Sequence, residues 1–344
     1  MMRQKMRWGV CFFLCCVFIV ALGPVAHAGN WKAQWKIASL APDGVGWARQ
    51  IKSIVLPAVE QVCQGDLKIK TYWGGVMGDD EDYIKKMRID QLQGAGLSGH
   101  GVTLAVPEMA VLELPFLFRS WDEVDYIKTK MAGTFDKLAK KNGYMMIIWN
   151  DEDFDLFFST KHDLASVDQL ARVRLLSWFG PVETEMAKTL GMTAIAVSMP
   201  ESPASLRSGV GDSIMVPPAW MVGTQLYSIA RFVSPLKFRY APAMVAVTWT
   251  RWETMPENYK KEYYRVRADV TKRFCDNVRK DNDLCLKSML EYGMKLTATS
   301  KETEAAIRKM SLPMYNQCAG KLYPKELLDE VQMHLANYRS GKGK

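Results

Sequence analysis

Apolar and polar residues alternate along the first half of the chain with two different periods. Stretches with a period of two predict β-strands, and stretches with apolar residues three to four positions apart predict helices. The predicted strands are 31–41, 66–73, 94–99 and 143–150, and the predicted helices are 46–63, 79–93 and 120–142. Strands and helices that follow one another in this way are typical of a parallel or mixed α/β sheet.

The same alternation starts again near Phe154. The predicted strands of this second round are 154–160, 172–177, 192–198, 211–216 and 244–250, and its predicted helices are 180–191 and 202–209. A chain of 344 residues exceeds what one hydrophobic core usually serves, so two lobes are expected. We expect 29–153, together with about 240–255, to form the first lobe and 154–239 to form the second.

An unusually long helical pattern follows at 256–293. At 1.5 Å per residue such a helix extends for about 55 Å, which is longer than either lobe alone. We therefore expect a spine helix that spans both lobes. The remainder, 294–344, is expected to form a C-terminal strand and helices that pack on the second lobe.

The first 28 residues have the layout of a secretory signal peptide. Three cations among the first seven residues precede an apolar block, Trp8–Leu22, and small residues flank His27. The block of about 15 residues is shorter than the roughly 20 that a spanning helix needs, although a retained anchor is the alternative. We expect the mature chain to begin near Gly29 and to be exported to the periplasm.

Charge and cysteine content narrow the possible functions. Without the three cations of the signal, the net charge falls from +8 to +5, and lysines and arginines are scattered among acids. This pattern describes a solvated surface and excludes a nucleic-acid partner.

Cys275 and Cys285 lie about 15 Å apart on one predicted helix, too far for a disulfide. Either of them could pair with Cys318, or these three and Cys63 could be buried free thiols.

No pattern typical of catalysis, cofactor binding or metal binding stands out. The segment Gly94–Gly99, "GAGLSG", matches a dinucleotide fingerprint, but its glycines lie on a predicted strand, where close backbone approach is expected instead. His100 is expected to be a loop histidine bonded to the backbone. The acidic run Asn150–Asp155 lacks the glycine and distal glutamate of a calcium loop and is expected to be a solvated hinge turn. We expect neither an enzyme nor a cofactor or metal site.

The stretch Val106–Val124, "VPEMAVLELPFLFRSWDEV", resembles the signature of solute-binding proteins of tripartite ATP-independent periplasmic (TRAP) transporters. Segments 72–98, 170–177, 187–202, 205–212 and 226–234 follow in family order and at family spacing. The resemblance implies a two-lobed periplasmic-binding-protein-like α/β fold with mixed sheets, hinge strands and a long spine helix. It also implies closure on a small-molecule ligand and delivery to TRAP membrane permease subunits. Some relatives use an additional helical-repeat periplasmic partner.

Three polar ligand positions of the family differ in this chain. The family arginine that pairs with a substrate carboxylate falls at Leu176, unless a register shift of two gives that role to Arg174. Met215 and Val216 occupy polar positions of a second segment. Asp155 stands near the place of a further arginine.

These departures predict an apolar or amphipathic ligand. A buried carboxylate without its cation costs several kcal/mol, whereas apolar burial gains about 25 cal/mol per Å². The predicted ligand-binding residues, each of which could instead belong to the core, are Trp73, Phe157, Arg174, Leu176, Trp178, Phe179, Met215, Val216 and Trp220. One alternative is a TRAP receptor for an organic acid that uses the displaced Arg174, or Arg207 or Arg239. The other is a periplasmic lipid carrier that serves no permease.

Overall fold

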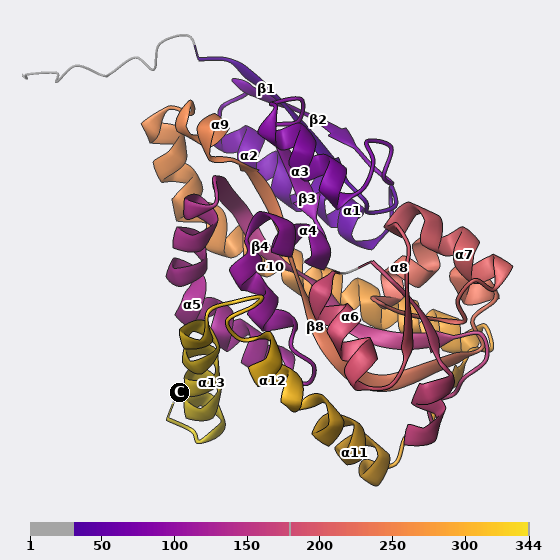
Figure 1. Ribbon diagram of the computed structural model, residues 1–344. Helices are drawn as coiled ribbons and strands as arrows, with labels where there is room; N and C mark the ends of the chain where they lie inside the picture. Colours follow the sequence, from indigo (N-terminus) through magenta and orange to yellow (C-terminus); the bar gives the residue numbers. More distant parts are fainter. Residues whose placement is uncertain (1–30, 179, 343–344) are drawn as a thin grey trace, which may run out of the picture. The chain divides into compact units, whose positions relative to one another are not determined.

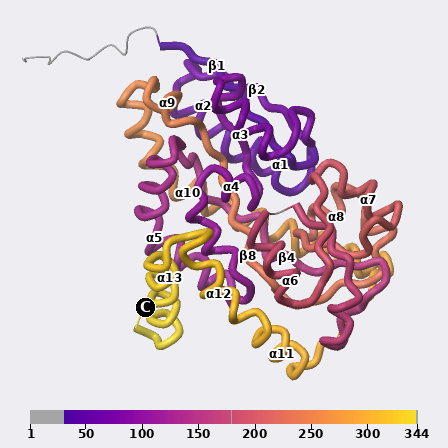
Figure 2. The backbone as a smooth tube through the Cα atoms, viewed as in Figure 1, coloured from indigo at the N-terminus to yellow at the C-terminus, as the bar shows by residue number. Residues whose placement is uncertain are grey.

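The computed structural model describes residues 31–178 and 180–342 of the chain. The predicted signal peptide and Phe179 therefore lie outside the described residues. From Lys32 onward the chain forms one folded unit in which strands and helices alternate (Figures 1 and 2).

The strands and helices have the following bounds. The strands are β1 (Ala33–Ser39), β2 (Leu67–Tyr72), β3 (Gly94–Leu97), β4 (Tyr144–Ser159), β5 (Arg174–Ser177), β6 (Thr193–Ala196), β7 (Ser213–Val216), β8 (Phe232–Thr248) and β9 (Lys295–Leu296). The α-helices are α1 (Gly46–Gln50), α2 (Leu56–Val62), α3 (Asp80–Arg88), α4 (Gly99–Ala105), α5 (Trp121–Lys141), α6 (Pro181–Thr189), α7 (Ser202–Ser208), α8 (Pro218–Gly223), α9 (Trp249–Glu253), α10 (Glu257–Glu291), α11 (Lys301–Ser311), α12 (Pro313–Cys318) and α13 (Lys325–Arg339). A π-helical turn, η1 (Ile51–Val55), joins α1 to α2, and the 3-10 turns are η2 (Pro107–Glu113), η3 (Val167–Arg172), η4 (Met199–Glu201) and η5 (Leu226–Ser228).

The strands of the described residues form one mixed sheet in the order β2-β1-β3-β8-β4-β7-β5-β6, with β9 paired to β8. The two long strands β4 and β8 run antiparallel to each other. Near one end of this pair β8 binds β3, and near the other end β4 binds β7. The long strands therefore join the two rounds of strands and helices, and the predicted mixed, two-lobed α/β class is confirmed.

The long helix α10 has 35 residues, close to the predicted extent. It contacts α1, η1 and α2 of the first round and α8 of the second, and it also packs on β4. Its position beside both groups is that expected of a spine helix. None of the helices in the described part of the chain is long and apolar enough to cross a membrane.

The C-terminal helices differ in part from the prediction that they pack on the second lobe. Helices α11 and α12 contact α6 of the second round, but α13 contacts α5 and η2 of the first (Figure 1). The apolar face of α13, with Leu328, Val331 and Leu335, is buried there. Arg339 at its end binds Glu123 on α5, with Nε–Oε1 at 2.8 Å.

The acidic run Asn150–Asp155 is not a solvated turn, so that prediction is wrong. The run lies within β4, and the side chains of Asp151 and Asp155 are fully buried. Asp151 binds Lys128, with Oδ1–Nζ at 2.8 Å, and Arg279, with Oδ2–Nη2 at 2.6 Å. Bulges in β4 shift the strand register within the run, and cations from other elements neutralise acids that alone would favour solvent.

The glycines of β3 serve the close approach predicted for them. A Cβ at Gly94 would lie 2.5 Å from the carbonyl oxygen of Ala246 on β8, and one at Gly96 would lie 3.1 Å from the ring of Trp47. The strand therefore needs glycine for packing, and no dinucleotide-binding turn is present at this place. The four described cysteines are free thiols, and Cys63, Cys275 and Cys318 are buried.

Candidate ligand cleft

A small cavity of about 60 Å³ lies where segments of both rounds meet. It is built at the carboxyl ends of β1, β3 and β7, the edge at which open α/β sheets usually bind their ligands. Its lining comprises Leu40, Ala41, Pro42, Val45, Gly46, Trp47, Gly96, Ser98, Glu152, Met199, Pro217, Ala219, Trp220, Val278 and Asn282. Most of these side chains are apolar, and Glu152 carries the one ionisable group among them.

A second hollow of about 320 Å³ shares two walls, Leu40 and Met199, with the first. Asp79, Asp80 and Glu81 lie at its border, together with His100 and with Ser177, Trp178 and Thr184 from the other round. Each of the two hollows thus has walls from both rounds, as a cleft between two lobes requires. We refer to the two hollows together as the cleft.

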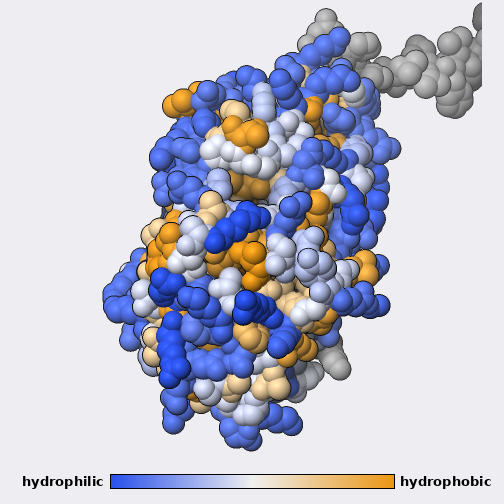
Figure 3. All heavy atoms as spheres, turned by 90° about the vertical axis from the view of Figure 1, so that its right-hand side faces the viewer, coloured by the Kyte–Doolittle hydropathy of each residue, from blue (hydrophilic) through white to orange (hydrophobic). Residues whose placement is uncertain are grey.

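The walls of the cleft are in contact in this structure. A Cβ at Gly223, at the end of α8, would lie 2.8 Å from Cγ of Pro42 after β1. A Cβ at Gly180, before α6, would lie 2.7 Å from Nδ1 of His100 on α4. The cleft is therefore closed, and closure brings the two sides together at positions that lack a side chain. On the face in Figure 3, apolar atoms interrupt the hydrophilic surface near mid-height.

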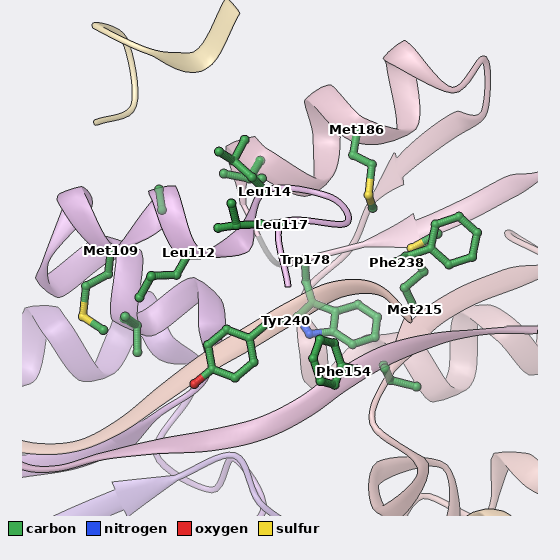
Figure 4. Close-up of a cluster of buried hydrophobic side chains, with 14 of the residues drawn as sticks. Met109, Leu112, Leu114, Leu117, Phe154, Trp178, Met186, Met215, Phe238 and Tyr240 are labelled. Atoms are coloured by element: carbon green, nitrogen blue, oxygen red, sulfur yellow. The ribbon is translucent and has the colours of Figure 1, made fainter. Parts of the chain in front are cut away.

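Two of the predicted ligand-binding residues, Trp178 and Trp220, lie at the cleft. Their ring centroids are 5.3 Å apart, with an angle of 36° between the ring planes. Figure 4 shows Trp178 beside Phe154 and Tyr240, within the same buried cluster as Met215. The tryptophan pair therefore connects the cleft with the hydrophobic core.

The other predicted apolar residues are placed differently. Leu176, Met215, Val216 and Phe157 are fully buried members of the core and do not line either hollow. Trp73 is half-buried after β2, with Nζ of Lys52 at 5.2 Å from its ring centroid. Phe179 falls outside the described residues, and the role of this set in ligand binding stays a prediction.

Arg174 is engaged away from the cleft. Its Nε donates to Oδ2 of Asp212 at 3.1 Å, its backbone N–H donates to Oδ1 of the same carboxylate, and its Nη2 donates to the carbonyl oxygen of Gly209. Although burial opposes the effect, these hydrogen bonds lower the pKa of Asp212. Arg207, another candidate clamp, donates to the carbonyl oxygen of Thr224.

Arg239 is completely buried and binds two carboxylates. Its guanidinium pairs with Asp155 and, at 3.0 Å from Nη1 to Oε2, with Glu113. A third buried carboxyl group, Glu183, lies near enough to raise the pKa of both acids and accepts a hydrogen bond from Ser177 at 2.6 Å. One cation and three acids thus occupy the place where the resemblance implied an arginine for the ligand.

The acids of this buried group titrate far from their usual range. Burial raises the pKa of Asp155 to about 7 and that of Glu113 to about 8, although Arg239 acts in the opposite direction. The group around Arg239 contains more acidic side chains than basic ones, so its positive charge is already balanced and would not bind a further carboxylate.

Sequence reasoning missed several residues that line the cleft. Trp47 falls within the predicted helix 46–63, and Glu152 falls within the acidic run predicted to be a solvated turn. Leu40 follows β1 and Met199 begins η4, and their own positions carry no signal. Their shared role depends on tertiary contacts between segments far apart in the chain. His100 lies at the border of the cleft, where burial lowers the pKa of its imidazole.

The fold and the cleft define a two-lobed solute-binding receptor. The chain matches the family "bacterial extracellular solute-binding protein, family 7" (DctP) over residues 56–321 and belongs to this family, which confirms the resemblance to TRAP solute-binding proteins. A solute-binding protein of Chromohalobacter salexigens is 22% identical over 300 residues, which are 87% of each chain. The family consists of receptors, not enzymes.

Solved structures support the same fold. The sugar acid binding protein of Advenella mimigardefordensis, in complex with galactonate, superposes with a TM-score of 0.83 at 18% identity, over 89% of this chain and 98% of that one. A TRAP periplasmic solute-binding protein of Desulfovibrio salexigens, with bound orotic acid, gives a TM-score of 0.82 at 17% identity, over 89% and 99%. One from Chromohalobacter salexigens, with bound d-glucuronate, gives 0.80 at 20% identity, over 87% and 99%.

Proposed function

We propose that this TRAP-type receptor captures an apolar or amphipathic small molecule in the cleft and delivers it to a membrane permease. One observation carries the proposal: no lysine or arginine is among the described residues that line either hollow. Four carboxylates do line them, Glu152 in the first and Asp79, Asp80 and Glu81 in the second. A carboxylate ligand would lie among these acids without a lysine or arginine to pair with it.

Apolar contact supplies enough energy for such a ligand. A molecule that buries roughly 300 Å² gains about 7 kcal/mol before the costs of association. Leu40, Met199 and Trp220 in the walls of the cleft provide apolar area for this contact. We also propose that the chain reaches the periplasm through the signal peptide predicted at 1–28, and that a helical-repeat partner takes part in delivery if the transporter has one.

An organic acid is the second candidate ligand. It is favoured by the neighbouring structures, which hold galactonate, orotic acid and d-glucuronate. For this chain to bind such a molecule, Arg174 or Arg239 would have to leave the carboxylates that now hold it. The two candidates therefore differ in whether an arginine must be released when the ligand binds.

Native mass spectrometry of the protein purified without added ligand separates the two candidates. We expect a bound molecule that organic solvent extracts and that carries no carboxylate. A co-purified sugar acid or dicarboxylate would refute the apolar proposal. Loss of the bound mass after treatment with a detergent that leaves the protein folded serves as a second readout.

A further inference from the structure

The first hollow contains two polar groups whose hydrogen-bonding capacity is not used within the protein. Trp47 lines this hollow, and its indole N–H is buried without a hydrogen-bond partner in the described residues. Glu152 lines it as well, and across 31–178 and 180–342 its carboxylate accepts one long hydrogen bond, 3.4 Å from the backbone N–H of Gly99. Buried polar groups are normally satisfied, so an unused donor beside an underused acceptor indicates a missing partner.

Two further polar residues of the hollow, Ser98 and Asn282, already make hydrogen bonds within the protein. Ser98 donates its hydroxyl to Asp80. Asn282 on α10 accepts a hydrogen bond from the backbone N–H of Ala219 at 2.8 Å and donates to the carbonyl oxygens of Glu152 and Val278. Asn282 is therefore a positioning residue that fixes the backbone of Glu152 relative to the start of α8. The indole N–H of Trp47 and the carboxyl group of Glu152 therefore remain available to a ligand.

We infer that this hollow recognises a hydroxyl group on an otherwise apolar ligand, which accepts a hydrogen bond from Trp47 and donates one to Glu152. Trp47 and Glu152 line the same hollow of about 60 Å³, which places both within reach of a ligand bound there. An ammonium group cannot accept from Trp47, and a carboxylate cannot donate to Glu152 and would meet like charge wherever Glu152 is ionised. A sugar acid carries many hydroxyl groups and would leave most of them without partners among these apolar walls.

The inference rests on the proposed apolar ligand and specifies its polar group. Burial, followed by the charges of Asp155 and Asp80, raises the pKa of Glu152 well above its usual range. A protonated Glu152 keeps its carbonyl oxygen as an acceptor and gains a donor, so binding of a hydroxyl tolerates either protonation state.

The test uses four probes with one carbon skeleton: toluene, benzyl alcohol, benzylamine and benzoate. Isothermal titration calorimetry compares their affinities for the full-length protein and for Trp47→Phe, Glu152→Leu and Glu152→Gln. We expect benzyl alcohol to bind most tightly and to lose about tenfold in affinity in Trp47→Phe and in Glu152→Leu, the loss typical of one buried hydrogen bond. Toluene should change by less than threefold, and Glu152→Gln should retain the alcohol because its amide oxygen still accepts.

Matched controls are Trp249→Phe and Glu326→Gln, which change a tryptophan and a glutamate away from the hollow. Equal affinities for benzyl alcohol and toluene, or losses that are the same for both probes, would overturn the hydroxyl site while leaving the apolar function intact. Tight binding of benzylamine that is lost in Glu152→Gln would show a cation site instead. Binding of benzoate alone, with neither neutral probe bound, would show that the proposed apolar function itself is wrong.

Discussion

Replacing Arg239 with methionine tests whether this buried cation exists to neutralise the acids around it. Methionine keeps an apolar stem of comparable length but removes both ion pairs, with Asp155 and with Glu113. All three side chains are fully buried, so neither carboxylate can turn to solvent without disrupting the fold. Breaking a buried pair by removing one partner typically costs about 3–5 kcal/mol, and we expect a loss in this range at pH 8.

The loss should depend on pH, and its sign follows from the raised pKa values. Without Arg239, the folded protein avoids two unpaired buried charges only if Asp155 and Glu113 are protonated. In the unfolded chain the same two acids lose their protons above about pH 4–5, so folding then requires proton uptake. The destabilisation should therefore be smaller at pH 5 and grow toward pH 8. The wild-type protein should show the same trend more weakly, because burial already raises the pKa of Asp155 and of Glu113 above their unfolded values. Its stability should fall as the pH rises through this window.

Urea denaturation followed by circular dichroism measures both effects, because an unchanged slope with denaturant shows that the folded state is still compact. The triple variant Arg239→Met, Asp155→Asn, Glu113→Gln should recover most of the lost stability, since it removes the charges together. Arg174→Met is the matched control: its pair with Asp212 involves a side chain that is 42% exposed, and a loss of about 1 kcal/mol or less is expected. A loss below about 1 kcal/mol for Arg239→Met at pH 8, or one without pH dependence, would refute the reasoning.

Three further predictions concern the cleft and its surroundings. Leu176→Arg should lower the melting temperature by several degrees and create no organic-acid affinity, because Leu176 is fully buried; an unchanged melting curve would contradict this. Gly223→Ala should keep Pro42 from its closed position and weaken ligand binding by about tenfold. X-ray scattering in the presence of ligand should then give a larger radius of gyration than for the wild-type protein. An unchanged affinity together with an unchanged radius of gyration would show that closure tolerates the added methyl group. Trp220→Ala should reduce the co-purified ligand seen by native mass spectrometry at least about tenfold, and full retention would place the ligand elsewhere.

The individual elements of this fold were largely predictable, whereas the continuity of the central strands was not. Local periodicity indicates most strands and helices, and the length of α10 follows from it closely. Strand β4 was predicted as two strands with a turn between them, because its bulges shift the alternation and its acidic residues have no partners nearby in the sequence. The 84-residue separation between Arg239 and Asp155 has no local signal, so single-sequence reasoning does not reveal it.

The candidate site was harder to predict than the fold for a related reason. A comparison of this sequence with the family pattern identifies positions where a polar ligand contact of the family is absent. It does not identify which other residues of this chain face the cleft. Trp178 and Trp220 line the hollows of the cleft, while Leu176, Met215 and Val216 are in the core, and the role of all five in ligand binding stays a prediction. The side chains of the latter three residues pack in the core, and other residues form the walls of the two hollows.

The distribution of charge around Asp155 explains why the proposed preference for an apolar ligand does not depend on one position alone. An acid stands near the place of a family arginine, and the buried cation nearby comes from β8, where Arg239 faces Asp155 and Glu113. The positive charge in this part of the protein pairs with the protein's own carboxylates. Restoring one arginine at Leu176 would add a second buried cation to a packed core without opening a path from the cleft to it. We therefore expect that carboxylate binding in this part of the protein would require coordinated changes at Asp155, Leu176 and Arg239, because each of these positions depends on its packing or charge partners.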